Sequence, residues 1–353
     1  MKNVAINPFI RLFLPVLLIL TLFGACEPNK KRIFIQILDK KAAEIAICTD
    51  TIAHFFAHIS PLEMAIQMKT DSNGLKPAPK LAYMAFLRQE AQAFSPAEAA
   101  CADRQLQKAL AYSYKISPNL RLPDTIQIAK IAGDAYGAQT FFTRQNTIFI
   151  PEAVLLGGQA EGVYSTLIHE IFHLYSRYNP EIKQKLFAEL GFRPLPHLEL
   201  NNMLKKRIFY NPDAVDIRYA IQVADAKGRK MEVVPIIFSR FGSYGVENGA
   251  FFQHLEFRLF EITAQKDSFF IAADHTGYEA EELRNFFAQI GRNTNYIIHP
   301  EEILADNFKL LALQKAGIRT VLLDIDEQGK LLLKKIEKIL LEQPQMSKNS
   351  SIN

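Results

Sequence analysis

The segment His169-Glu170-Ile171-Phe172-His173 sets the strongest limit on the fold of this chain. Residues four apart lie on one face of an α-helix, so His169 and His173 can direct two imidazole nitrogens toward one metal ion. Glu170 lies roughly 100° away around the helix, where its carboxylate can reach a water molecule beside that ion. Two nitrogen ligands, an open coordination position and a carboxylate base are the components of a hydrolytic zinc site. The segment therefore predicts a helix that carries a metal centre.

Apolar residues recur at helical spacing around this segment, which favours a well-formed and partly buried helix. They are Val163, Leu167, Ile171, Leu174 and Tyr178. We expect the helix to begin just after Gly157-Gly158 and to end near Tyr178, because Asn179 precedes a proline and is disfavoured in the α region. An amphipathic helix with two ordinary buried histidines is the alternative interpretation of the same pattern.

The first 25 residues have the features of an export signal. Lys2 and Arg11 are the only charged residues before an apolar run over 12–23, and Gly24-Ala25-Cys26 follows it. A basic start, a short apolar core and small residues before the cut are typical of a secretory signal, and the run is short for a transmembrane helix. The small residues before Cys26 also resemble a bacterial lipoprotein cleavage site. That resemblance implies lipidation of Cys26 and a membrane-anchored protein of the cell envelope, facing the periplasm or the outside; simple secretion is the alternative.

The charge of the chain gives no reason to expect a nucleic-acid partner. Loss of residues 1–25 removes two positive charges, so the formal net charge falls from +4 to +2. A nearly neutral surface provides neither the basic patch that binds nucleic acid nor a polybasic membrane-binding face. The hydrophobic fraction of 49% is ordinary for a globular protein.

Two cysteines, Cys48 and Cys101, remain once Cys26 is assigned to lipid. Because an exported chain enters an oxidising compartment, a disulfide between them and two free thiols are both compatible with the sequence. Neither cysteine has a metal-ligating neighbour in the sequence, and we expect no catalytic role for either.

The pattern divides the chain into regions of different secondary structure. Residues 26–135 are expected to be mainly helical, with helices around 40–69, 80–92 and 96–116. A hairpin over 139–150, a β-rich insert over about 205–275 and helices near 279–290 and 300–316 are expected to follow, and residues 346–353 to form a disordered tail. His54 and His58 are also four apart, but no carboxylate follows the first of them, so we interpret them as ordinary histidines.

A third metal ligand is expected from the helix at 300–316. No histidine lies six residues after His173, because Asn179 occupies that position. Glu302 and Asp306 are four apart on one helical face, so Glu302 can ligate metal while Asp306 hydrogen-bonds the far nitrogen of a ligand histidine. Glu301 is the alternative ligand, and an acidic first helical turn without a metal role is the plain structural interpretation.

These two helices together resemble the gluzincin class of zinc metallopeptidases, through His169-Glu170-x-x-His173 and Glu302-x-x-x-Asp306. The resemblance implies an α+β fold with a zincin-like core of a small sheet and the two motif helices, within residues 136–345. It also implies Zn²⁺ held by His169, His173 and Glu302, with Glu170 as general base.

The same resemblance implies a donor for the developing oxyanion close to the glutamate helix. Tyr296 is our candidate, and His275 and His299 are its competitors. The expected activity is zinc-dependent hydrolysis of a peptide or protein substrate by an envelope lipoprotein. Two other interpretations stay open: an envelope lipoprotein without activity that uses the scaffold as a binding module, and a structural metal site in a protein with another task.

Overall fold

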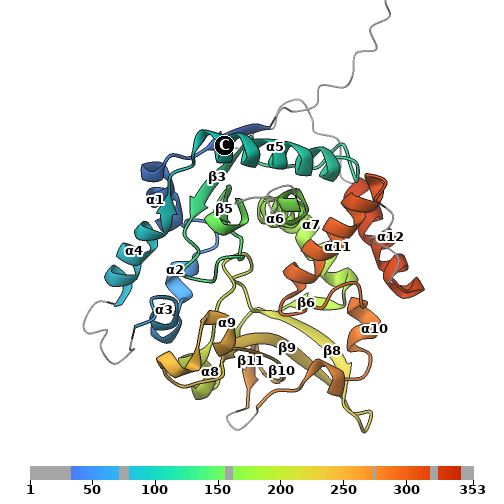
Figure 1. Cartoon of the computed structure of the whole chain (residues 1–353). Helices are drawn as coiled ribbons and strands as arrows, with labels where there is room; N and C mark the ends of the chain where they lie inside the picture. Colours follow the sequence, from blue (N-terminus) through green and yellow to red (C-terminus); the bar gives the residue numbers. More distant parts are fainter. Residues whose placement is uncertain (1–32, 71–78, 156–161, 273–275, 319–324, 343–353) are drawn as a thin grey trace, which may run out of the picture. The chain divides into compact units, whose positions relative to one another are not determined.

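The structure is a computed structural model that describes residues 33–70, 79–155, 162–272, 276–318 and 325–342. The expected signal segment with Cys26, the candidate His275 and the expected tail lie outside these residues. The chain from Arg32 onward forms one compact unit. Its architecture is α+β, as the sequence predicts: two β-sheets are combined with helices (Figure 1). In the described part of the chain, no helix has the combined length and apolarity that crossing a bilayer would require.

The first sheet has the strand order β1-β3-β5-β4, and a short strand β2 pairs with β3 at one end. Its strands are β1 (Phe34–Ile37), β2 (Ala91–Gln92), β3 (Thr125–Ile131), β4 (Phe142–Arg144) and β5 (Thr147–Pro151). β1, β3 and β5 are parallel, and β4 is antiparallel to β5, so the hairpin expected at 139–150 is present with β4 at the edge. Every residue of β5 is buried, as expected for a central parallel strand covered on both faces.

The region before the hairpin is rich in helices but is not exclusively helical. Its helices are α1 (Lys40–Cys48), α2 (Phe55–His58), α3 (Pro61–Gln67), α4 (Pro79–Glu90) and α5 (Pro96–Ser113). β1 and β3, which the sequence pattern did not indicate, place this region in the same sheet as the hairpin. Cys48 and Cys101, whose state the sequence left open, are free thiols.

The expected metal-binding helix is α6 (Val163–Tyr178), and it ends at the predicted residue. Every residue from Leu167 to Ser176 is buried, so the buried surface is wider than the predicted stripe. The cause is that α6 packs against both α5 and α11 (Pro300–Lys315), between which it lies in Figure 1. Two further helices, α7 (Pro180–Glu189) and α12 (Glu327–Leu341), pack against each other and against α11.

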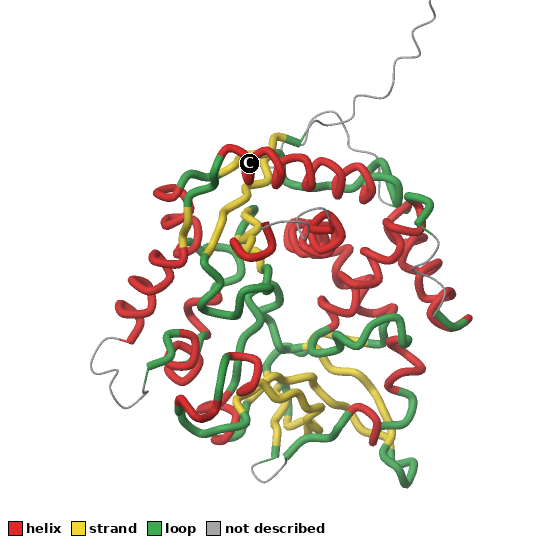
Figure 2. The backbone as a smooth tube through the Cα atoms, viewed as in Figure 1, coloured by secondary structure: helices red, strands yellow, loops and turns green. Residues whose placement is uncertain are grey.

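The expected β-rich insert forms a second sheet of six strands in the order β6-β8-β9-β10-β11-β7 (Figure 2). Its strands are β6 (Phe192–Pro194), β7 (Leu198–Glu199), β8 (Tyr219–Ala224), β9 (Lys230–Ser239), β10 (Leu255–Gln265) and β11 (Ser268–Ile271). The helices in and after this sheet are α8 (Asn202–Arg207), α9 (Phe251–His254) and α10 (Phe286–Ile290). Short 3₁₀ turns occupy Glu152–Leu155, Val246–Asn248 and Ala280–Glu282. The sheet begins earlier than expected, because β6 and β7 precede the predicted insert.

Candidate metal centre

α6 and α11 bring two histidines and one glutamate together in the interior. Nε2 of His169 lies 3.0 Å from Oε2 of Glu302, and Nε2 of His173 lies 3.5 Å from the same oxygen. Ligands of a tetrahedral zinc ion with bonds near 2.0 Å are about 3.3 Å apart, so the two distances bracket that value. His169, His173 and Glu302 therefore form a buried cluster that could bind a metal ion.

The outer nitrogen of His169 is held by the same helix that supplies Glu302. Nδ1 of His169 lies 3.0 Å from Oδ1 of Asp306, one turn beyond Glu302 on α11. Asp306 is itself held by the Thr294 hydroxyl and by Lys309. Burial acts to lower the pKa of His169, but its hydrogen bonds with Asp306 and Glu302 outweigh that effect and raise the pKa to about 9. Asp306 thus occupies the position that orients a ligand imidazole.

Glu301 lies behind His173, on the side away from Glu302. Its Oε1 is 3.4 Å from Nδ1 of His173 and accepts a hydrogen bond from the Ser176 hydroxyl, and its Oε2 lies 3.1 Å from Nζ of Lys183. Although burial would raise the pKa of Glu301, Lys183 and His173 lower it to about 2. Of the two glutamates that the sequence left as alternatives, the structure brings Glu302 to both Nε2 atoms and places Glu301 on an outer nitrogen.

His299 fixes the first turn of α11 and with it both glutamates. Its Nδ1 accepts a hydrogen bond from the Glu301 amide over 3.1 Å, and its Nε2 donates to the Asp216 carbonyl over 3.0 Å. This pattern requires a neutral ring, and burial lowers the pKa of His299 to about 4. With both nitrogens engaged, His299 is a helix cap, and it does not line the cavity beside the cluster.

Glu170 faces a cavity of about 280 Å³ that opens beside the cluster. Its carboxylate is buried, and within the described residues Oε2 has no hydrogen-bond partner. Burial, reinforced by the nearby Asp213 carboxylate, raises the pKa of Glu170 to about 8. A buried oxygen without a protein partner, next to two imidazoles and a carboxylate, fits a site that takes up a metal ion and water.

Tyr296 lies beside His169, in the loop that precedes α11. The two rings stack with centroids 6.2 Å apart, and the Tyr296 side chain lines the cavity while 42% of its surface remains exposed. Desolvation, together with the carboxylates of Glu302 and Asp213, raises the pKa of Tyr296 well above its usual value. The phenol is therefore neutral, and it can act as a hydrogen-bond donor.

Two residues of the cluster's surroundings, Asn211 and Asp213, were not found from the sequence. Nδ2 of Asn211 donates to Oε1 of Glu302 over 2.6 Å, which leaves Oε2 for the histidines. Asp213 accepts a hydrogen bond from the Thr143 amide over 2.7 Å and lines the cavity. Their only sequence signal is Asn211-Pro212-Asp213, a composition typical of any turn.

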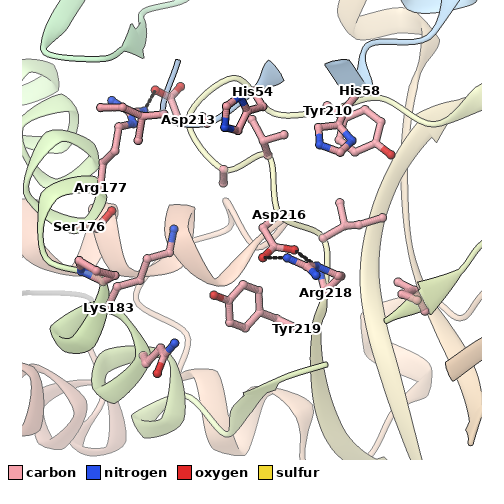
Figure 3. Close-up of a pocket in the computed structure, with 18 of the residues that line it drawn as sticks. His54, His58, Ser176, Arg177, Lys183, Tyr210, Asp213, Asp216, Arg218 and Tyr219 are labelled. Atoms are coloured by element: carbon pink, nitrogen blue, oxygen red, sulfur yellow. Dashed lines mark hydrogen bonds and ion pairs between the residues drawn. The ribbon is translucent and has the colours of Figure 1, made fainter. Parts of the chain in front are cut away.

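A larger cavity of about 680 Å³ is also lined by Asp213. Figure 3 shows Asp216 next to Arg218 and Asp213 next to Arg177. Oδ1 of Asp216 lies 2.8 Å from Nε of Arg218, and Oδ1 of Asp213 lies 4.0 Å from Nη2 of Arg177. His54 and His58 also line this cavity. His54 has a left-handed backbone (φ 58°) and precedes α2, so the two histidines do not share the helical face that their spacing suggests. Among the described residues they form no metal-type cluster.

Comparisons of the chain with protein-family models, with curated proteins and with solved structures found no match.

Proposed function

We propose that this chain is a zinc-dependent peptidase of the gluzincin type. The observation that carries the proposal is the convergence of Nε2 of His169 and Nε2 of His173 on Oε2 of Glu302. Beside them, a carboxylate oxygen of Glu170 has no hydrogen-bond partner among the described residues. A structural zinc site is normally closed by four protein ligands. Here two of the three ligand-type residues, His169 and Glu302, line an open cavity that is also lined by the candidate base, which favours a catalytic centre.

The ligand set matches the preference of zinc for imidazole nitrogen and carboxylate oxygen. His169 and His173 would hold the ion through Nε2 and Glu302 through Oε2, while Asp306 and Glu301 keep the two imidazole rings in place. A zinc ion supplies Lewis acidity, which acidifies water and polarises a carbonyl group. On α11, Glu302 reaches the inner nitrogens of both histidines, while Glu301 and Asp306 reach their outer nitrogens, and this division of roles supports the assignment.

Glu170 would act as general base and general acid. Its carboxylate faces the cavity and is close enough to the cluster to take a proton from water there and return it to the leaving amine. The phenol of Tyr296 would donate a hydrogen bond to the carbonyl oxygen as negative charge develops on it. Because Glu170 is buried, its carboxylate is shielded from bulk water, which strengthens its electrostatic interactions in the cavity.

The edge strand β4 supports an extended peptide as the substrate. Gln139, Thr140 and Phe141 line the cavity of about 280 Å³ beside the cluster, which we call the metal cavity, and they lead directly into β4. The three residues of β4 are buried and the Thr143 amide already donates to Asp213, so an extended peptide would pair with the segment 139–141 that leads into this terminal strand. The first sheet and the motif helices would make up a zincin-like core, with the second sheet as its β-rich insert. Cys26 would anchor the exported protein to a membrane.

Metal analysis combined with a peptide-library digest tests the proposal. The purified protein is expected to contain about one zinc per chain and to cleave members of the library. A chelator should abolish cleavage, and zinc should restore it. Stoichiometric zinc without cleavage of any peptide would refute the peptidase and favour a metal-containing binding module. Absence of bound metal would refute the metal centre itself.

A further inference from the structure

A small apolar chamber adjoins the metal cavity. Its volume is about 50 Å³, and its walls are mainly aromatic and aliphatic. The residues that form these walls include Phe141, Phe142, Ile237, Phe252, Leu255 and Ile298. Phe142 belongs to the first sheet, whereas Ile237 and Leu255 belong to β9 and β10 of the second sheet. The chamber is thus built where side chains of both sheets meet.

The chamber and the metal cavity share part of their lining. Thr140, Phe141, Asp213 and Tyr296 line both spaces. Asn211, another residue of the chamber wall, hydrogen-bonds directly to Glu302 of the metal cluster. A peptide with its reacting carbonyl at the cluster would therefore place a neighbouring side chain at the chamber.

The distribution of polarity is that of a binding pocket. The hydrogen-bonding residues Asn211 and Asp213 belong to the loop beside the cluster, whereas β9, β10, α9 and the segment before α11 contribute apolar side chains. Phe252 remains 55% exposed although it is a large apolar residue. Mostly apolar walls with a few placed polar groups are typical of ligand pockets, and exposed aromatic residues often mark binding surfaces.

The size of the chamber limits what it can hold. An engineered cavity that binds benzene has a volume of about 150 Å³. The chamber has about one third of that, so an aromatic ring does not fit without displacing a wall residue. We infer that the chamber binds a short aliphatic side chain, such as that of alanine or valine, next to the bond that is cleaved. This inference rests on the proposed peptidase activity.

Substrates that differ at one residue test the inference. A peptide from the library digest is resynthesised with Gly, Val, Phe or Asp in turn on each side of its cleaved bond. At one of the two positions, kcat/KM for Val should exceed that for Phe and Asp by at least about tenfold. Equal cleavage of all four at both positions would overturn the chamber but leave the peptidase intact. No cleavage of any peptide would overturn the peptidase and, with it, this inference.

Two variants change the chamber without touching the metal cluster. Leu255→Ala enlarges it, so the preference for Val over Phe should fall at least about tenfold. Leu310→Ala, at another half-buried leucine that does not line the chamber, is the matched control and should keep the wild-type order. Phe252→Ala removes an exposed wall residue with little risk to folding; it should lower kcat/KM for the Val peptide more than for the Gly peptide. An unchanged order of substrates in a folded Leu255→Ala protein, or no effect of Phe252→Ala, would refute the chamber.

Discussion

Asn211 donates a hydrogen bond to Oε1 of Glu302 and thereby turns Oε2 of that carboxylate toward the two histidines. The bond joins the loop after α8 to the first turn of α11, two segments that are 91 residues apart in the chain. Because Glu302 is buried, an oxygen deprived of this donor has no water to replace it. Asn211 is therefore a positioning residue for the metal cluster.

We expect Asn211→Ala to weaken zinc binding by about 10–100-fold, the usual effect of removing an outer partner of a ligand. The measurement is competition with a chromophoric chelator at fixed pH. Asn202→Ala, at an exposed position of α8, is the control and should bind zinc like the wild type. Wild-type affinity of a folded Asn211→Ala protein would show that Glu302 does not depend on this bond.

The adjacent glutamates of α11 should differ in their effect on zinc content. Glu302→Ala removes the carboxylate on which both Nε2 atoms converge and should abolish zinc binding. Glu301→Ala should retain zinc with lower affinity, because His173 keeps its Nε2 and loses only an outer partner. It should also destabilise the fold, since Lys183 loses its buried counter-ion. The measurements are the zinc content and the thermal unfolding of both variants. If Glu302→Ala kept its zinc and Glu301→Ala lost it, Glu301 rather than Glu302 would be the metal ligand.

The sequence predicted those parts of the site that lie on regular helices. A period of 3.6 residues relates His169 to His173 and Glu302 to Asp306, so local spacing alone groups each pair on one face. The convergence of α6 and α11 was expected from the need of a zinc site for a third ligand and from a family resemblance, and no local pattern shows it. Local spacing could not choose between Glu301 and Glu302, because that choice depends on the rotation of α11, which the His299 cap and packing against α6 determine.

Elements defined by long-range pairing were not predicted. β1 is only four residues long, and the alternation of Ile126 and Ile128 in β3 ends at Lys130, so these short patterns did not distinguish strands from the helical surroundings. Asn211 and Asp213 occupy an irregular loop, where no periodicity reveals that their side chains face a site. α12 was not predicted either, although its apolar residues recur at helical spacing.

The proposed export signal makes a prediction that is independent of catalysis. If Cys26 is a lipidation site, a labelled fatty acid should be incorporated into the wild type and not into Cys26→Ser. Cys101→Ser is the control, because Cys101 is a free thiol of the folded part and should not affect labelling. The measurement is metabolic labelling in bacterial cells followed by membrane fractionation. Equal labelling of wild type and Cys26→Ser, or release of unlabelled wild type, would favour simple secretion.

The metal-free protein should lose stability as the pH rises from about 6.5 to about 9. The pKa of His169 is 6.5 in the unfolded chain and about 9 in the folded cluster. Its contribution is therefore fully present below pH 6.5 and is lost as the pH rises through 9. The buried Glu170, with a pKa raised to about 8, acts in the same direction. Zinc affinity should change in the opposite direction and increase as the pH rises, because the ion competes with protons for the Nε2 atoms.

Thermal unfolding of chelator-treated and zinc-loaded protein across this range measures both effects. His169→Asn removes the titrating ring and should flatten the profile of the metal-free protein. His197→Asn, at an exposed histidine, should leave the profile unchanged. A metal-free protein whose stability rises between pH 6.5 and 9 would contradict the ion-pair arrangement of His169 with Asp306 and Glu302.

Glu170→Gln separates catalysis from metal binding most directly. Glu170 lies next to the cluster without belonging to the group formed by His169, His173 and Glu302, and Gln keeps the size of the side chain while removing the base. General-base catalysis is worth about 10²–10⁴-fold, so hydrolysis should fall at least about a hundredfold. Zinc content should stay at the wild-type level, and thermal stability should be equal or higher, because a buried carboxyl group with a raised pKa is replaced by a neutral one.

The comparison requires kcat/KM, zinc content and unfolding temperature measured on the same preparations. Glu181→Gln, at an exposed glutamate of α7, is the matched control and should resemble the wild type in all three. Loss of zinc together with activity in Glu170→Gln would make Glu170 a metal ligand rather than a base. Undiminished hydrolysis would show that another group takes the proton, and Asp213, which lines the same cavity, would then be the residue to replace.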